Sequence, residues 1–249
     1  MTASENHTTS LTNRIAVVTG ASSGIGAATA RTLAAEGARV AALGRREDRL
    51  KELDALPVGV DVRDAADVRA AADRIRAELG RPDLVVANAG VMLGAPFEEA
   101  APDEWDAMIG TNVTGLLHTA RAFVDDLLAA AADGRAADLV LVGSVGGHQV
   151  FPNYAVYCAT KAAVAHLTRN LRAELGPRGV RVKNVEPGIT STELGDGMRD
   201  LSIKEQLGQW RNGLETLRAE DIAAGIAWAA GMPARMNVAE MIIVPTAQG

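Results

Sequence analysis

Tyr157 and Lys161 are the two residues whose types and spacing most directly suggest chemistry. They stand four residues apart in an alanine-rich stretch with a helical pattern, so both side chains should lie on one face of a helix. A free tyrosine has a pKa of about 10, and a cation held nearby lowers such a pKa by roughly 1–3 units. We therefore expect Lys161 to prepare Tyr157 for general acid/base chemistry. Taken alone the pair is a weak signal, because a half-buried tyrosine beside a solvated lysine has the same spacing.

Ser144 and Asn112 add to this signal through their positions. Ser144 follows a predicted strand over 139–142, and the carboxyl ends of strands border the ligand crevice in open α/β sheets. Its hydroxyl can donate a hydrogen bond to a substrate carbonyl oxygen. Asn112 falls inside a predicted helix over 104–131, where asparagine is unfavourable by propensity. The two interpretations of Asn112 are a local structural or catalytic role and a merely exposed side chain.

A glycine-rich turn follows the first predicted strand and precedes the first helix. It reads Thr19-Gly20-Ala21-Ser22-Ser23-Gly24-Ile25-Gly26. Its glycines allow a sharp turn and a close backbone approach to a pyrophosphate, and the helix N-terminus would present free N–H groups to that group. Apart from Thr19 and Ala21, we expect these residues to contact a dinucleotide. The alternative is a tight turn that binds nothing.

The end of the second predicted strand bears on which nicotinamide dinucleotide would fit. In a dinucleotide-binding fold, an acidic residue there bonds the ribose 2′-hydroxyl of NAD, whereas an arginine accommodates the 2′-phosphate of NADP. This strand ends at Gly44 and is followed by Arg45 and Arg46. No carboxylate would repel the phosphate, and a guanidinium can clamp it in bidentate fashion. The sequence therefore predicts NADP(H), with a solvated helix start as the alternative for the two arginines.

Short β-rich runs alternate with helical stretches along the chain. The predicted strands cover 15–19, 39–43, 58–60, 84–87, 139–142, 180–185 and 241–244, and the predicted helices 27–36, 65–79, 104–131, 155–175 and 222–230. This alternation predicts one α/β domain over 12–249, a Rossmann-type doubly wound parallel sheet of about seven strands flanked by helices on both faces. Residues 1–11 are expected to form a flexible tail. The glycine-rich segment 192–213 is expected to be a lid over the substrate.

The bulk composition excludes several classes of protein. A formal net charge of −6 over 249 residues argues against nucleic-acid binding. A single cysteine, Cys158, permits no internal disulfide, and no run of apolar residues is long enough to predict a membrane span. The polar first ten residues do not resemble a signal peptide, so we expect a cytoplasmic protein. The histidines show no metal-ligand spacing, so no metal is expected.

These motifs occur in the order and spacing of the short-chain dehydrogenase/reductase family, which the chain resembles over residues 13–249. The matching features are the glycine turn, Asn88-Ala89-Gly90, Asn112, Ser144, Tyr157, Lys161 and Pro187-Gly188. The ending from Glu240 to Gln248 is most similar to clavulanate dehydrogenase and the NADP-dependent serine and 3-hydroxy acid dehydrogenases. The resemblance implies an NADP(H)-dependent oxidoreductase that interconverts a ketone or aldehyde and an alcohol, assembled as a homodimer or homotetramer. The alternative is a catalytically silent NADP(H)-binding regulatory module, although such proteins typically lose the tyrosine or the lysine.

The resemblance also implies a role for each motif residue. Tyr157 would donate and accept the proton, Ser144 would orient the carbonyl, and Lys161 would hold the ribose hydroxyls and lower the pKa of Tyr157. Asn112 would hold a water that relays protons from Lys161. Asp61 would contact the adenine through its side chain. The other implied cofactor contacts are Val62, Asn88, Ala89, Gly90, Pro187, Gly188, Ile189, Thr190 and Thr192.

The residues expected to face the substrate are mainly apolar or small and carry few fixed charges. They are Met92, Val145, Gly146, His148, Phe151, Asn153, Tyr154 and the lid. This set favours a neutral ketone, aldehyde or cyclic metabolite over a polyanion.

Overall fold

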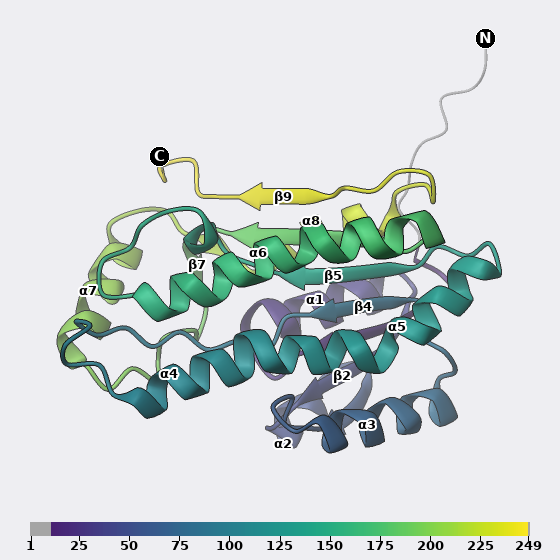
Figure 1. Ribbon diagram of the computed structural model, residues 1–249, viewed down its shortest axis with the longest axis horizontal. Helices are drawn as coiled ribbons and strands as arrows, with labels where there is room; N and C mark the ends of the chain where they lie inside the picture. Colours follow the sequence, from purple (N-terminus) through teal and green to yellow (C-terminus); the bar gives the residue numbers. More distant parts are fainter. Residues whose placement is uncertain (1–10, 249) are drawn as a thin grey trace, which may run out of the picture.

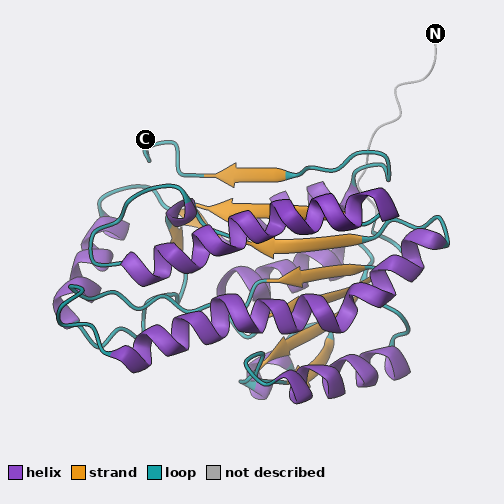
Figure 2. Cartoon of the chain, viewed as in Figure 1, coloured by secondary structure: helices purple, strands orange, loops and turns teal. Residues whose placement is uncertain are grey.

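A seven-stranded parallel sheet lies between two layers of helices (Figures 1 and 2). The computed structural model describes residues 11–248. The strands are β1 (Ile15–Thr19), β2 (Arg39–Gly44), β3 (Leu56–Gly59), β4 (Leu84–Ala87), β5 (Asp138–Val142), β6 (Arg181–Pro187) and β9 (Glu240–Ile243). Their order is β3-β2-β1-β4-β5-β6-β9. The predicted doubly wound α/β fold is confirmed, and the strand order reverses between β1 and β4, where ligands bind in such sheets.

Each face of the sheet has its own hydrophobic core. The helices α3 (Ala65–Glu78), α5 (Leu116–Ala132) and α6 (Ala155–Leu175) cover one face, and α1 (Gly24–Ala35) and α8 (Ala219–Gly231) cover the other (Figure 1). Because successive strand residues point to opposite faces, Val17 of β1 packs in the first core and Val18 in the second. A short helix, α2 (Glu47–Leu50), follows β2.

The predicted helix over 104–131 is interrupted by a wider turn. It consists of α4 (Pro102–Ile109), a π-helical segment (Gly110–Gly115) and α5. Gly115 allows this segment to approach the loop after β3, because a Cβ there would lie only 2.6 Å from Val62 Cγ2. Short π segments inside helices often occur at functional sites, and this one contains Asn112.

The predicted lid segment contains a helix and is flanked by a second, smaller sheet. Helix α7 (Leu201–Asn212) occupies most of 192–213. The strands β7 (Thr190–Ser191) and β8 (Leu217–Arg218) pair in parallel on either side of it and join its two ends. The sequence did not predict either strand, because each has only two residues and no periodicity to reveal it.

Leu11 belongs to the folded domain rather than to the predicted tail over 1–11. Its side chain is 1% exposed, and its N–H donates to Glu36 O at 3.0 Å. Residues 1–10 of that predicted tail lie outside the described residues. Within the part that the structure describes, no helix is both long and apolar enough to cross a membrane.

A buried charge cluster joins the amino ends of the central strands, at the opposite edge from the crevice. The fully buried Asp138, at the start of β5, accepts hydrogen bonds on Oδ2 from Arg14 Nη2 (2.8 Å) and Arg181 Nη2 (2.7 Å). Lys183 Nζ lies 3.0 Å from its Oδ1. Burial opposes ionisation of Asp138, but Lys183, Arg14 and Arg181 outweigh that effect and lower its pKa.

Candidate active site

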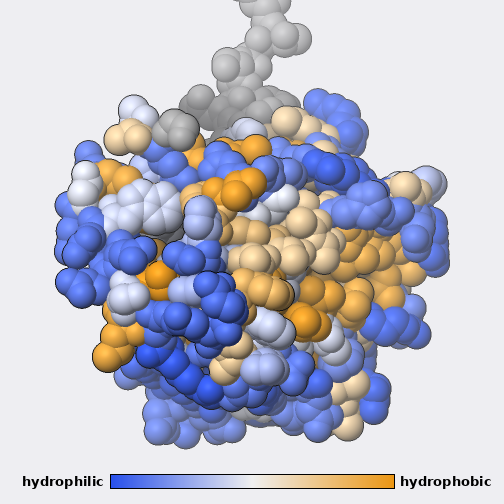
Figure 3. Space-filling model, turned by 60° about the vertical axis from the view of Figure 1, so that its left-hand side comes forward, coloured by the Kyte–Doolittle hydropathy of each residue, from blue (hydrophilic) through white to orange (hydrophobic). Residues whose placement is uncertain are grey.

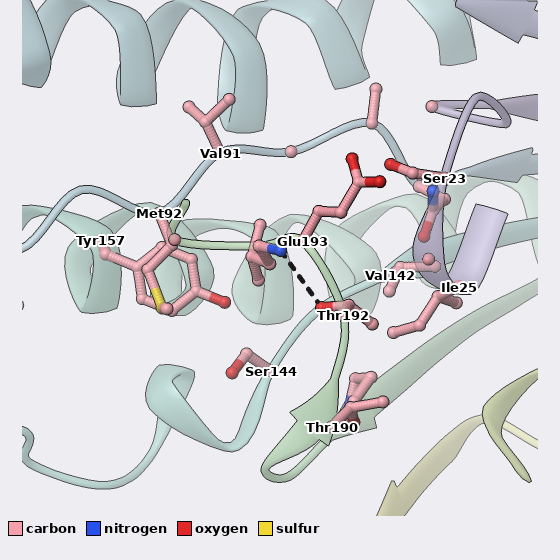
Figure 4. Close-up of a pocket in the computed structure, with 18 of the residues that line it drawn as sticks. Ser23, Ile25, Val91, Met92, Val142, Ser144, Tyr157, Thr190, Thr192 and Glu193 are labelled. Carbon is pink, nitrogen blue, oxygen red and sulfur yellow. Dashed lines mark hydrogen bonds between the residues drawn. The ribbon is translucent and has the colours of Figure 1, made fainter. Parts of the chain in front are cut away.

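A cavity of about 500 Å³ opens where β1, β2, β4, β5 and β6 end. Every residue predicted to bind a cofactor lines it except Gly26. Figure 4 shows Tyr157 and Ser144 towards one end of this cavity and Ser23 and Ile25 towards the other. The structure thus brings motifs that are far apart in the sequence together around a single space.

The glycine turn forms the floor of the cavity between β1 and α1. Gly20 and Gly24 have φ angles of +68° and +51°, which favour glycine. Gly26 does not line the cavity but packs under the turn, where a Cβ would collide with Gly20 O. Ser23, the N-cap residue of α1, makes no side-chain capping bond, so no capping side chain competes for the first N–H groups of this helix. Such N–H groups form an anion-binding position.

Arg46 connects the glycine turn to the lid segment. Its Nη2 donates to Ser22 Oγ (3.1 Å) and Ser23 Oγ (2.8 Å), and its Nη1 donates to Glu193 Oε2 (2.9 Å). Arg49 Nη1 donates to the other oxygen of Glu193 at 2.6 Å. Arg46 is exposed at the start of α2, as the alternative of a solvated helix start predicts, and its guanidinium also holds a carboxylate beside the turn.

Asp61 and Val62 line the same cavity after β3. Arg63 Nη2 donates to Asp61 Oδ2 at 2.6 Å, and hydrogen bonds from Arg63 lower the pKa of Asp61 despite partial burial. Asp61 does not cap the next helix, because Asp64 caps α3 by accepting from Ala66 N.

Thr19 is a structural residue that sequence reasoning missed. Its Oγ1 accepts hydrogen bonds from Asn88 N (3.0 Å) and Ala89 N (3.1 Å), and Asn88 Nδ2 donates to Thr19 O at 2.9 Å. These bonds fix the Asn88-Ala89-Gly90 turn against the glycine turn. A threonine at the end of an apolar strand gives no local sign of this role, because its partners lie about 70 residues away.

Ser144, Tyr157 and Lys161 converge at the other end of the cavity. Tyr157 and Lys161 are 7% and 6% exposed, and Lys161 Nζ lies 5.8 Å from the centre of the Tyr157 ring. Lys161 Nζ donates to Val142 O at 2.9 Å. A Cβ on Gly146 would lie 3.4 Å from Ser144 Oγ and 3.5 Å from Tyr157 Cε1, so these two side chains flank the same point.

Asn112 is buried rather than exposed, and its side chain ties three segments together. Its Oδ1 accepts from Val91 N (2.8 Å), and its Nδ2 donates to Val91 O (2.9 Å) and Thr160 Oγ1 (3.1 Å). Both amide hydrogens are therefore used inside the protein. Asn112 does not line the cavity itself, but it fixes the loop after β4 and helix α6, which do.

Segment 192–213 and Gln248 line the remaining side of the cavity. Leu194, Leu207 and Arg211 are three of the residues that this segment contributes to the cavity. Gln248 also lines it, and its Oε1 accepts a hydrogen bond from Ile189 N at 2.8 Å. The ending that contains Gln248 was noted in the sequence, but only the structure shows that it supports the backbone after β6.

Comparison with known proteins assigns the chain to a family. The family model for the short chain dehydrogenases matches residues 14–201. An uncharacterized oxidoreductase of Staphylococcus aureus (strain MRSA252) is 34% identical over 244 residues, which are 95% of this chain and 99% of that protein. The chain belongs to the short-chain dehydrogenase family, a family of oxidoreductases.

Solved structures show how closely this short-chain dehydrogenase follows known folds. The closed form of a serine dehydrogenase complexed with NADP+ superposes with a TM-score of 0.86 at 31% identity, covering 94% of this chain and 96% of that one. A 3-ketoacyl-(acyl-carrier-protein) reductase from Brucella melitensis complexed with NADH gives a TM-score of 0.85 at 28% identity, with coverages of 94% and 98%.

Burial displaces the pKa values of both central side chains of this short-chain dehydrogenase. It raises the pKa of Tyr157 to about 12, against the opposite effect of the Ser144 hydroxyl. It lowers the pKa of Lys161 to about 8. The predicted direction for Tyr157 is therefore wrong in this structure, because the cost of desolvating the phenolate exceeds any stabilisation by neighbouring groups.

The pKa of Lys161 predicts a pH-dependent stability. A lysine of the unfolded chain titrates near 10.4, so from about pH 8 to pH 10.4 the unfolded state binds more protons and the folded state gains stability as pH rises. Below pH 8 Lys161 is charged in the folded state, and this buried charge lowers the free energy of unfolding by about 3 kcal/mol, which corresponds to the same pKa shift. Urea unfolding of the wild type and of Lys161→Met should therefore show the variant as the more stable protein at pH 7 and a smaller difference at pH 10. A difference that is independent of pH would contradict this account.

His148 is paired rather than free. Its Nε2 lies 2.7 Å from Oε1 of the buried Glu186, beside the loop that carries Ser144. Within residues 11–248, no group of three or more histidine, cysteine, aspartate and glutamate side chains is placed to hold a metal ion.

Proposed function

We propose that this short-chain dehydrogenase is an NADP(H)-dependent enzyme that interconverts a ketone or aldehyde and an alcohol, with Tyr157 as general acid/base. The observation that carries the proposal is the convergence of Tyr157, Ser144 and Lys161 at one end of a cavity whose other end has the features of a dinucleotide site. The decisive assay is consumption of NADPH with a panel of ketones and aldehydes. A catalytically silent binding module would consume none.

The residues around the cavity fit an NADP molecule. A Cβ on Gly20 would lie only 2.8 Å from Ala89 Cα, so glycine lets the turn pack closely against the loop after β4. The first residues of α1 border the cavity, and their N–H groups would face the pyrophosphate. The Glu193 carboxylate on Arg46 is a stand-in that shows an anion can be held there. Arg45 and Arg46 would hold the 2′-phosphate, and the glycine turn from Gly20 to Ile25 the pyrophosphate. The adenine would lie on Asp61 and Val62, and the nicotinamide near Pro187, Gly188, Ile189, Thr190 and Thr192. Asn88, Ala89 and Gly90 would also contact the cofactor.

The nicotinamide, when bound, supplies or accepts the hydride, and the protein handles the proton. In reduction, the Tyr157 hydroxyl donates its proton to the carbonyl oxygen, while Ser144 donates a hydrogen bond to the same oxygen and orients it. A pKa of about 12 keeps Tyr157 protonated near neutral pH, which suits proton donation. Lys161 would bind the ribose hydroxyls with its ammonium group. Asn112, whose amide hydrogens are both used, would hold through Oδ1 a water that relays protons from Lys161 towards solvent.

The cofactor preference has a direct test at Arg46. Arg46→Ala should raise the KM for NADPH by about 10–100-fold and leave the KM for NADH almost unchanged, because only the phosphate uses a charge-assisted bond. Glu193→Gln should lower the KM for NADPH by about two- to fivefold, since an exposed ion pair that competes for Arg46 is worth no more than about 1 kcal/mol. Steady-state kinetics with both cofactors measure these effects.

The matched control for both variants is Asp48→Asn in α2, two residues after Arg46, where the exposed carboxylate pairs among the described residues with Lys51 at 3.8 Å. It should leave both KM values unchanged. If Arg46→Ala impaired NADPH and NADH equally, the proposed phosphate contact would be wrong.

We also propose that the chain assembles as a homodimer or homotetramer through α5 and α6. The outer faces of these helices expose Leu117, Ala159, Ala162 and Ala163. Figure 3 shows a band of apolar surface on the side of the molecule where these helices lie. Small side chains of this kind allow two helices to approach closely. Leu117→Lys should shift sedimentation towards the monomer.

A further inference from the structure

A buried carboxylate lies behind the loop that carries Ser144. Glu186 is 1% exposed, and its Oε1 accepts hydrogen bonds from Asn184 Nδ2 at 2.6 Å and from His148 Nε2 at 2.7 Å. Its Oε2 is shielded from solvent and has no hydrogen-bond partner in the described part of the chain. A half-satisfied buried carboxylate costs free energy, and an aliphatic side chain would be buried at less cost. Stability alone therefore does not account for Glu186.

Ser144 and His148 stand at the two ends of one short turn. Ser144 is the N-cap residue of the 3-10 helix Val145–Gly147, and its Oγ accepts a hydrogen bond from Gly146 N at 3.1 Å. His148 is the C-cap residue of the same helix. Because only three residues separate them, a displacement of His148 would be passed directly to Ser144.

Two side chains of β6 hold both ends of this turn. Successive strand residues point to opposite faces, so Asn184 and Glu186 lie on the same face of β6. Asn184 packs against Gly143, where a Cβ would lie only 2.6 Å from Asn184 Oδ1 and 3.1 Å from Glu186 Cγ. At the other end of the turn, Glu186 holds His148. Since Gly143 directly precedes Ser144, the start and the end of the turn are both fixed on β6.

His148 itself does not line the cavity. The sequence placed it among the residues that face the substrate, but the cavity wall does not include it, and its side chain is 37% exposed. A carboxylate only accepts hydrogen bonds, so the His148 ring carries a hydrogen on Nε2 and donates it to Glu186. His148 is therefore placed to act on the reaction only through Glu186 and the turn.

We propose that His148 is a positioning residue, which with Glu186 holds the turn so that the Ser144 hydroxyl meets the carbonyl oxygen of the substrate. This inference rests on the proposed function and deepens it. The bond from Gly146 N to Ser144 Oγ leaves the hydroxyl hydrogen of Ser144 available to the substrate. Catalytic groups must be held within about 0.5 Å of their productive position, and a misplacement of about 1 Å can lower a rate by about 10²-fold.

The test is a double-mutant cycle between His148 and Ser144. His148→Leu should lower kcat for a ketone substrate by about tenfold and leave the KM for NADPH almost unchanged, because it alters no cofactor contact. Ser144→Ala should lower kcat by about 10²-fold, and in that background His148→Leu should change kcat by less than about twofold. A structural role alone would lower kcat by the same factor in both backgrounds, and this outcome would overturn the proposal.

Two further variants test the hydrogen bond of His148. His148→Gln places an amide N–H close to the position of Nε2 and should keep at least about half of the wild-type kcat. The matched control is His166→Leu, which removes an exposed histidine of α6 outside the cavity and should leave kcat unchanged. A His148→Gln variant as slow as His148→Leu would show that the bond to Glu186 does not matter, and the proposal would be wrong.

Amide hydrogen exchange separates this proposal from the proposed function. In His148→Leu without substrate, exchange should become about tenfold faster over residues 143–148 and stay at the wild-type rate over the glycine turn, because only the first segment is held by Glu186. If no ketone or aldehyde consumed NADPH, the proposed function would fail, yet this local change would still support the hold of His148 on the turn. Wild-type exchange over residues 143–148 would overturn it even in an active enzyme.

Discussion

Tyr157→Phe should lower kcat by about 10²–10⁴-fold, which is the usual contribution of a positioned general acid/base. The substitution removes only the hydroxyl, and the ring keeps its packing in a site that is 7% exposed. The affinity for NADPH should remain close to that of the wild type, because the glycine turn and Arg46 at the other end of the cavity are unchanged. Steady-state NADPH oxidation gives the first quantity, and a fluorescence titration with NADPH gives the second.

Tyr154→Phe is the matched control for this experiment. Tyr154 also lines the cavity and is half-buried, but it packs against the cluster of Met198, Ile203 and Leu207. Loss of the Tyr154 hydroxyl should change kcat by less than about tenfold, which is below the contribution of a general acid. Near-normal turnover in Tyr157→Phe would remove the proposed mechanism, whatever the control showed.

Asp138→Asn should destabilise the fold by about 3–5 kcal/mol, the usual cost of breaking a buried ion pair. The change keeps the shape of the side chain but leaves Arg14, Arg181 and Lys183 without their shared carboxylate. Urea denaturation at neutral pH measures the loss. Because the cluster lies at the edge of the sheet opposite the cavity, kcat of the folded variant should remain near the wild-type value.

The pH dependence of this loss has a defined sign. The folded pKa of Asp138 is lowered, so its stabilisation is present above the unfolded value of about 3.9 and is lost as pH falls through the folded value. The two stability curves should therefore converge in acid. Asp125→Asn, which removes an exposed partner of Arg121, should cost no more than about 0.5 kcal/mol. A similarly small loss for Asp138→Asn would show that the cluster does not stabilise the fold.

The sequence predicted the elements whose signals are local. The strands β1 and β4 and helix α6 have the predicted bounds, because each is a run of suitable residues between clear turn signals. Helix α1 begins at Gly24 rather than at the predicted Ala27, since the glycines that form the turn are poor helix formers by propensity. Most of the cavity-lining motifs were predictable for the same reason, because they follow directly on a strand, whereas Tyr157 and Lys161 lie inside α6.

Features that depend on distant pairs were not predictable. Arg14 and Asp138 are 124 residues apart, and Arg46 and Glu193 are 147 residues apart. Neither pair leaves a trace in local composition. The direction of the Tyr157 pKa also required the structure, because the spacing to Lys161 shows which groups are neighbours but not how far water is excluded from them.

The π-helical segment at Gly110–Gly115 sets the angular phase between α4 and α5. Each α-helical residue advances by about 100°, and a π turn holds one residue more than an α turn. Shortening this segment by a single residue would let an unbroken α-helix form, with every main-chain bond intact. It would also rotate one half of the helix against the other by more than a quarter of a turn, and Asn112 would no longer meet both Val91 and Thr160. Length variation here would thus preserve the main-chain hydrogen bonds of the helix and still disrupt both the packing of its buried face and the geometry of the cavity.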